Sequence, residues 1–153
     1  MIHIERSLVI DASPDAVWEV LGRFMHIDEF APFVVSVDAL TPGADGLGSI
    51  RRCNFDNGSS LVEEVIDWRP GQSYRIRASE FGPIPMTTAT VDIKLQPMGP
   101  ARTHVIWAMD CQMKYGPVGW LMGQTLVKRP VGKVLEANLA ALGAKVCGTR
   151  SAA

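Results

Sequence analysis

The chain has 153 residues, a formal net charge of −1, 47% hydrophobic residues and 20% charged residues. This size and composition suit one globular domain and exclude a disordered chain. Lys and Arg are scattered rather than clustered, which argues against nucleic-acid binding because phosphate contacts need a basic surface. The first residues resemble no signal peptide and no long uncharged apolar window occurs, so we expect a cytoplasmic protein without integral membrane association.

Cysteines and histidines occur in none of the short spacings typical of zinc sites, and three widely spaced cysteines predict no disulfide framework. No glycine-rich nucleotide loop or serine-hydrolase motif is present. We therefore expect no metal and no cofactor. The residues concerned are Cys53, Cys111, Cys147, His3, His26 and His104.

The chain is predicted to begin with a strand over residues 3–10, because these residues alternate and are rich in Ile, Leu and Val. A short helix should follow, with Ser13 as its N-cap and Pro14 at its first position. Gly22 can end this helix. A second short helix is expected around residues 26–30.

Turn-forming residues then separate six further predicted strands, which gives a series of antiparallel hairpins and a seven-stranded sheet. Alternation along the later strands predicts one buried face and one solvent-exposed face of the sheet. The six strands are predicted at residues 34–40, 48–55, 60–67, 73–80, 86–96 and 103–115.

A long helix is predicted after Gly116 and Pro117, because apolar residues recur there with a helical period. Pro130 should kink it, and Arg129 is biased away from helical geometry. We expect one domain over residues 1–147 and a flexible tail over 148–153. The stripe on its buried face comprises Trp120, Val127, Val131, Val134, Leu135, Asn138 and Leu142.

Several short segments carry a resemblance to a known family. The most specific is IDASPDAVWEVL at residues 10–21, followed by GSIRR at 48–52, EEV at 63–65, Trp107, and YGP at 115–117. With these segments the chain resembles the SRPBCC or START-like superfamily, specifically its polyketide cyclase/dehydrase branch. The resemblance implies the α+β helix-grip fold of birch-pollen-allergen-like proteins, in which a curved antiparallel sheet surrounds a long C-terminal helix. Two short helices lie between strands one and two. It also implies an interior, mostly apolar ligand cavity between sheet and helix.

Alternation and helical period indicate which residues would form the walls of that cavity. Met and Trp side chains among them would give an adaptable wall, although ordinary core packing is the alternative for each residue. The strand candidates are Tyr74, Ile76, Val91, Ile93, Trp107, Met109 and Met113, and the helix candidates are Trp120, Val127, Val131 and Leu135.

Glu63 is the preferred polar candidate, with Glu64 as the alternative, because a register slip by one residue exchanges the two faces of a strand. A buried, unpaired carboxylate has a raised pKa and can act as a general acid or base. Either Arg51 or Arg52 could meet this carboxylate across neighbouring strands or receive an acidic ligand group. Tyr74 offers a phenol, although a buried tyrosine more often donates to a backbone carbonyl.

Three functions follow from these patterns. The favoured one is binding of a small hydrophobic molecule, such as a lipid, quinone, polyketide or aromatic compound. The second is a polyketide cyclase or dehydratase in which Glu63, Tyr74 or Arg51 moves protons. The third is a protein-interaction module with a filled interior. The oligomeric state is left open, and fold alone does not decide among the three.

Overall fold

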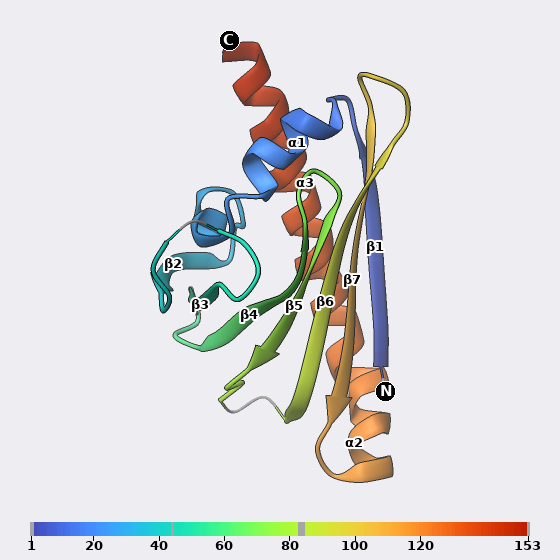
Figure 1. Ribbon diagram of the computed structural model, residues 1–153. Coiled ribbons are helices and arrows are strands. Elements are labelled where there is room, and N and C mark those ends of the chain that lie inside the picture. Colours follow the sequence, from blue (N-terminus) through green and yellow to red (C-terminus); the bar gives the residue numbers. More distant parts are fainter. Residues whose placement is uncertain (1, 44, 83–84, 153) are drawn as a thin grey trace.

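The computed structural model describes residues 2–43, 45–82 and 85–152, with side chains as far as Gly148 (Figure 1). The elements, in chain order, are β1 (Ile2–Ile10), α1 (Pro14–Leu21), η1 (Phe24–Glu29), β2 (Val34–Ala39), β3 (Ile50–Phe55), β4 (Ser60–Arg69), β5 (Ser73–Ser79), β6 (Met86–Pro97), β7 (Thr103–Met113), α2 (Gly116–Met122), η2 (Gly123–Val127) and α3 (Lys128–Ala152). None of the helices described is at once long and apolar enough to cross a membrane.

The seven strands form one antiparallel sheet in the order β1-β7-β6-β5-β4-β3-β2. The helices α1 and η1 connect β1 at one edge of the sheet with β2 at the other edge. The sheet curves, and α3 runs along its concave side (Figure 1). The predicted helix-grip fold is confirmed.

The first helix begins as its sequence predicts. The Ser13 hydroxyl accepts a hydrogen bond of 3.2 Å from the backbone N–H of Ala16, and Pro14 occupies the first helical position. The helix ends with Gly22 as its C-cap, where an added Cβ would lie 2.8 Å from the Trp18 ring. The next helix is a 3-10 helix over Phe24–Glu29, which begins two residues earlier and ends one residue earlier than predicted.

Alternation places the core on the concave face of the sheet. In β5, Tyr74, Ile76 and Ala78 are buried, whereas Arg75 on the opposite face pairs with Asp92 at 2.7 Å. The buried and solvent-exposed faces predicted from the two-residue period are therefore present.

Three strands, β2, β5 and β7, end before their predicted limits, and β5 and β7 share one backbone reason. Glu80, with φ 55°, follows β5, and Tyr115, with φ 71°, follows β7. A strand requires negative φ, so a left-handed residue ends the ladder. β7 therefore stops at Met113.

The final helical region is continuous from Gly116 to Ala152 but contains one wider π-helical turn, η2. This turn ends at Val127, three residues before Pro130, and Arg129 is helical despite its position before proline. The irregularity thus lies in residues 123–127 rather than at Pro130. The helix also continues past Gly148, where the sequence predicts a flexible tail, and the mobility of that segment stays a prediction.

Glycines bring the start of this helical region close to the sheet. An added Cβ at Gly119 would lie 1.6 Å from the Lys114 carbonyl oxygen, and one at Gly123 would lie 1.8 Å from the Ile2 side chain. Each contact is far shorter than a van der Waals separation. A larger residue at Gly119 would overlap the Lys114 backbone, and one at Gly123 would have to displace the end of the Ile2 side chain.

We predict that Gly119→Ala lowers the free energy of unfolding by about 1–3 kcal/mol, because its methyl group overlaps backbone atoms. Gly148→Ala is the control, since an added Cβ there meets nothing within 4 Å. It should be neutral or stabilise the helix by up to about 1 kcal/mol. Urea unfolding measures both, and equal effects of the two substitutions would contradict the packing described.

Candidate functional site

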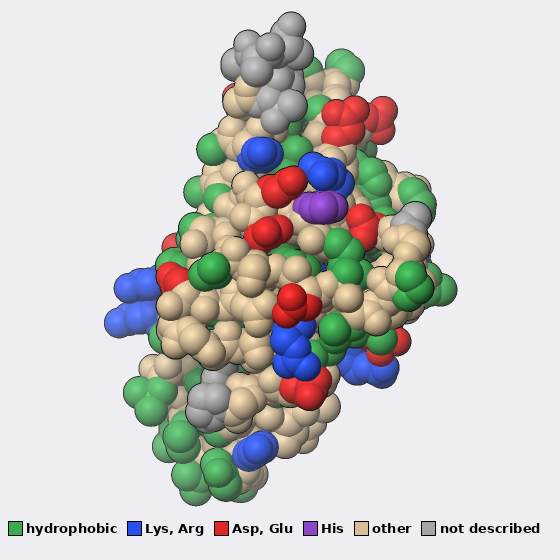
Figure 2. Space-filling view, turned by 90° about the vertical axis from the view of Figure 1, so that its left-hand side faces the viewer, with side chains coloured by type: hydrophobic (Ala, Val, Ile, Leu, Met, Phe, Trp, Pro, Cys, Tyr) green, Lys and Arg blue, Asp and Glu red, His purple; other side chains and the backbone are tan. Residues whose placement is uncertain are grey.

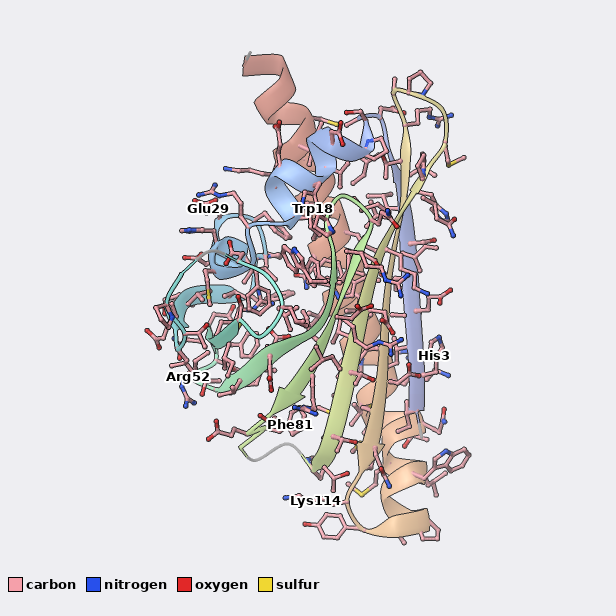
Figure 3. The ribbon with its side chains drawn as sticks, viewed as in Figure 1. His3, Trp18, Glu29, Arg52, Phe81 and Lys114 are labelled. Carbon is pink, nitrogen blue, oxygen red and sulfur yellow. The ribbon has the colours of Figure 1, made fainter. Side chains whose placement is uncertain are left out.

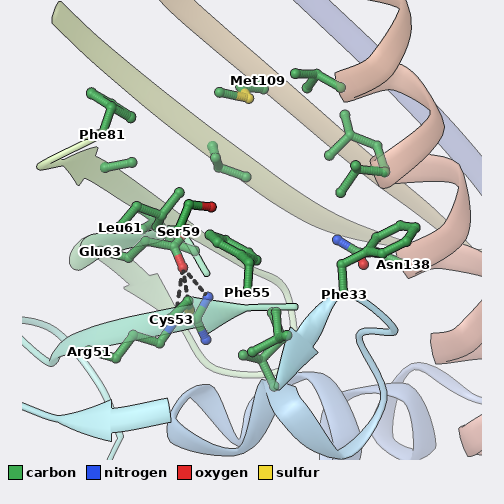
Figure 4. Close-up of a pocket in the computed structure, with 18 of the residues that line it drawn as sticks. Phe33, Arg51, Cys53, Phe55, Ser59, Leu61, Glu63, Phe81, Met109 and Asn138 are labelled. Atoms are coloured by element: carbon green, nitrogen blue, oxygen red, sulfur yellow. Dashed lines mark hydrogen bonds and ion pairs between the residues drawn. The ribbon is translucent and has the colours of Figure 1, made fainter. Parts of the chain in front are cut away.

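A cavity of about 370 Å³ lies between the concave face of the sheet and α3 (Figure 4). Strands β3 to β7 and α3 supply most of its walls, and most lining side chains are apolar. The volume lies within the range of small-molecule sites.

The cavity occupies only one end of the interior because aromatic rings fill the other. Trp68 stacks on Tyr74 with ring centroids 5.3 Å apart, and Trp18 of α1 meets Trp68 edge-on at 5.1 Å. Phe24 completes this cluster, with its centroid 6.2 Å from that of Tyr74. The interior is therefore packed next to α1 and hollow beyond it.

A buried ion pair lies where the packed part meets the hollow part. Arg51 of β3 and Glu63 of β4 are register partners, and the Glu63 Oε1 atom lies 2.7 Å from Nη2 and 3.0 Å from Nε of Arg51. The guanidinium also donates to the Phe24 carbonyl oxygen and lies 3.8 Å from the centroid of the Phe24 ring. Arg51 thus links two strands to η1.

Strand register decides which member of each charged doublet faces inward. The Glu63 side chain is 12% exposed, whereas Glu64 is 37% exposed and bonds Arg77 at 3.0 Å on the outer face. Arg52 likewise points outward, 3.7 Å from Glu80. The inward pair is therefore Arg51 with Glu63.

The surroundings keep Arg51 and two titratable groups near the pair, Cys53 and Tyr74, in their protonated forms. Burial alone would lower the pKa of Arg51, but the Glu63 carboxylate raises it, and the net shift is upward. Burial raises the pKa of Cys53, whose thiol donates to Glu63 Oε1 at 3.2 Å. Burial also raises the pKa of Tyr74, whose hydroxyl donates to the Leu21 carbonyl oxygen at 3.3 Å. Neither Cys53 nor Tyr74 is poised to lose a proton near neutral pH.

Two polar groups of the cavity keep unused hydrogen-bonding capacity. All the bonds to Glu63 end on Oε1, and no described residue donates to Oε2. Asn138 of α3 lines the cavity and is 9% exposed, and its amide has no hydrogen-bond partner among the residues described. Figure 4 shows Glu63 and Asn138 on opposite sides of the cavity. The site thus offers a carboxylate acceptor on one wall and a combined donor and acceptor on the other.

Many of the predicted site residues meet at this cavity. They come from the five strands β3 to β7 and from the middle of the long helical region, as the two periodicities require. Those that line it are Arg51, Glu63, Ile76, Val91, Trp107, Met109, Val131 and Leu135.

Five other predicted wall residues do not line this cavity. Tyr74 and Ile93 are register partners in the packed end of the interior. Met113 and Trp120 instead line a smaller pocket beside the start of α2, and Val127 packs against the core.

The misplacement of Trp120 has a specific cause. The π turn over residues 123–127 adds about one residue to the helical path, so a 3.6-residue stripe extended back from α3 misses the buried position. Gly119 occupies that position, and Trp120 is 48% exposed.

Other lining residues were missed by the sequence reasoning. Val134 and Asn138 lay on the predicted helical stripe, and strand alternation indicates Leu61 and Ala78. The corner before β2 and the β3–β4 turn have no periodicity that could indicate their contribution. The missed residues are Ile27, Phe33, Val34, Cys53, Phe55, Asp56, Asn57, Ser59, Leu61, Ala78, Phe81, Met86, Val134 and Asn138. In the described part of the chain, no three His, Cys, Asp or Glu side chains are grouped so that they could hold a metal ion.

We predict that Arg51→Met lowers the free energy of unfolding by about 3–5 kcal/mol, because it leaves the Glu63 carboxylate buried without its partner. The double variant Arg51→Met/Glu63→Leu should recover most of that loss. Arg52→Met is the control and should change stability by less than about 0.5 kcal/mol. Urea unfolding of these three variants and of Glu63→Leu forms the test, and a loss in the double variant equal to the sum of the losses in Arg51→Met and Glu63→Leu contradicts a coupled pair.

We also predict that the Cys53 thiol is alkylated much more slowly in the folded protein than in urea at about pH 8, where an exposed cysteine is partly ionised. Burial raises its pKa, so the reactive thiolate is scarce while the protein is folded. Mass spectrometry of the peptide containing Cys53 after timed iodoacetamide treatment measures this. Equal rates in the two states would show that the thiol is ionised or accessible.

Comparison with known proteins identifies related folds. A family model described as "Polyketide cyclase / dehydrase and lipid transport" matches residues 1–146, while no curated protein matches. The Zhui aromatase/cyclase of Streptomyces sp. R1128 is 20% identical with a TM-score of 0.71, covering 95% of this chain and 93% of that one.

Two further solved structures are similar over nearly the whole chain. A norcoclaurine synthase of Thalictrum flavum is 19% identical with a TM-score of 0.77, covering 97% of this chain and 96% of that one. A Thermus thermophilus protein is 16% identical with a TM-score of 0.78, covering 97% of this chain and 99% of that one. At such identities the likeness establishes the fold. The family match, which spans residues 1–146, shows that the chain belongs to the family described as polyketide cyclase / dehydrase and lipid transport.

Proposed function

We propose that the protein binds a small, mostly apolar molecule carrying at least one hydroxyl group, in the cavity between the sheet and α3. The observation that carries this proposal is the combination of an apolar cavity of about 370 Å³ with two unused polar groups, on Glu63 and Asn138. The apolar walls supply affinity by burying the body of the ligand, and the polar groups orient it.

The ion pair suits the Glu63 carboxylate to this role. Arg51 donates two hydrogen bonds to Oε1 and neutralises the charge, which leaves Oε2 to accept from a ligand hydroxyl. Such a charge-assisted hydrogen bond is stronger than one between neutral groups. The Asn138 amide can then receive either a hydroxyl or a carbonyl at the opposite end of the ligand.

The cavity walls favour a flat or flexible ligand of modest size. Met86, Trp107 and Met109 present polarisable side chains that adapt to an aromatic ring or a short chain. A volume near the lower end of the usual range favours one small ring system over a two-tailed phospholipid. Phenolic, quinol-like and short polyketide compounds therefore fit the proposal best.

A second candidate function is a cyclase or dehydratase acting on a poly-β-ketone, which is favoured by the carboxylate in the cavity and by the family match. Glu63 Oε2 would take a proton from a methylene carbon between two carbonyls. The resulting enolate carbon would bond to a ketone carbon of the same chain, and the new alkoxide would take the proton back from Glu63 to become a hydroxyl. Loss of that hydroxyl with a neighbouring proton releases water, while Asn138 holds a carbonyl oxygen.

The binding proposal predicts that 2-naphthol binds about tenfold tighter than naphthalene, because only 2-naphthol can donate to Glu63. Asn138→Leu removes the amide but keeps the volume of this cavity wall. The ligand affinities of this variant therefore separate what the polar group on α3 contributes to binding from what apolar burial contributes. Glu63→Gln should reduce the preference for the hydroxyl. Glu64→Gln is the matched control, because Glu64 lies on the outer face. Fluorescence titration or calorimetry gives the affinities.

Two outcomes would decide against these functions. Absence of saturable binding by either naphthalene compound, or equal affinity for both in the wild type and Glu63→Gln, removes the proposed site. The cyclase candidate is tested separately by incubating a reactive poly-β-ketone with wild type, Glu63→Gln and Glu64→Gln. Identical product ratios with and without protein exclude catalysis.

A further inference from the structure

The start of the final helical region exposes a cluster of large apolar side chains. In a helix of a water-soluble domain, residues of this size normally face the core, and a contiguous exposed group of them marks an interaction site. Hydrophobic side chains gather at the lower end of the molecule in Figure 2, where Figure 1 places α2. We call this cluster the α2 surface, and it consists of Tyr115, Val118, Trp120, Leu121 and Leu126.

The glycine contacts explain why these side chains face solvent. Gly119 and Gly123 occupy the buried side of the helix, against Lys114, Met113 and Ile2. Turning the helix to bury Leu121 or Trp120 would drive a large side chain into a space that lacks room for a Cβ atom. The small residues face the sheet and the large apolar ones face solvent.

The helical region that carries the α2 surface bears unpaired basic side chains. The acidic residues that flank it, Asp110 and Glu136, bond His3 and Arg6. Residues 111–135 themselves include Lys114, Lys128, Arg129 and Lys133 but no Asp or Glu, in a chain with a net charge of −1. None of these four side chains forms an ion pair with any residue that the structure describes. Figure 3 shows Lys114 at the same end of the molecule as α2. The apolar cluster is therefore accompanied by unpaired positive charge.

We propose that the α2 surface docks the protein on an anionic lipid bilayer, with its apolar side chains in the interface and its basic side chains near the lipid headgroups. Trp and Tyr side chains favour the boundary between headgroups and acyl chains, and basic residues gain energy near an anionic leaflet. A second copy of the chain suits the surface less well. A symmetric dimer would bring these basic groups together without an acidic partner.

Docking in this way brings one wall of the cavity close to the bilayer. The backbone N–H of Lys114 donates to the Pro85 carbonyl oxygen at 2.9 Å, and Met86 pairs with Met113 in the sheet. Met86 and Phe81 also line the cavity. The α2 surface therefore adjoins the cavity through the segment that carries Met86, although docking does not depend on what the cavity binds.

Vesicle sedimentation tests the proposal with the full chain. Vesicles of phosphatidylcholine alone are compared with vesicles containing about 30% phosphatidylglycerol, at about 0.05 M and about 0.5 M NaCl. We expect binding to the anionic vesicles that weakens at high salt. Leu121→Glu and Leu126→Glu, at positions 58% and 66% exposed, should each weaken it about tenfold or more. Leu47→Glu, at a position 71% exposed outside the α2 surface, is the matched control and should bind like wild type.

Trp120 provides a second readout that does not depend on sedimentation. Its emission should shift to shorter wavelength on anionic vesicles, and Trp120→Phe should lose this shift while retaining most of the binding. Absence of binding to anionic vesicles overturns the proposal, as does equal loss of binding in Leu47→Glu and Leu121→Glu. A stable dimer in gel filtration that Leu121→Glu converts to monomer would instead assign the surface to self-association. None of these outcomes bears on naphthol binding in the cavity.

Discussion

The ion pair between Arg51 and Glu63 holds together the part of the fold on which the cavity depends. Arg51 is fully buried, and it bonds the carboxylate on the neighbouring strand and the Phe24 carbonyl oxygen of η1. A guanidinium in this position is stable only because its charge is matched and its donors are used. By tying two strands to the 3-10 helix, the pair fixes the boundary between the aromatic cluster and the hollow end of the grip.

The sequence predicted those parts of the site that depend on periodicity and register. Alternation indicated that Glu63 shares a face with Leu61, and the pairing of Arg51 with Glu63 in the sheet agrees with that register. The periodic stripe likewise placed Val131 and Leu135 against the cavity. The order of elements and the motif at residues 10–21 predicted the helix-grip fold.

Other features depend on geometry that a one-dimensional pattern does not contain. The π turn shifts the helical phase, so Trp120 faces solvent although it lies on the extrapolated stripe. Tyr74 and Ile93 share the inward face with Ile76, but the aromatic rings of α1 and β4 fill the interior beside them. Whether an inward residue lines a cavity or packs in the core is decided by what stands opposite, and alternation indicates only the face.

Small residues at two places shape the cavity and the α2 surface. Ala78, in register with Glu63, lines the cavity and leaves space on its wall. Gly119 and Gly123 let the helix backbone approach the sheet and leave larger neighbours outside.

The most direct measurement of the central claim is a ¹H–¹⁵N spectrum of the Asn138 side-chain amide, assigned by its loss in Asn138→Leu, during titration with 2-naphthol. We expect a saturable shift of these signals in wild type, whereas signals unmoved at saturating ligand would contradict a cavity with polar groups at its two ends.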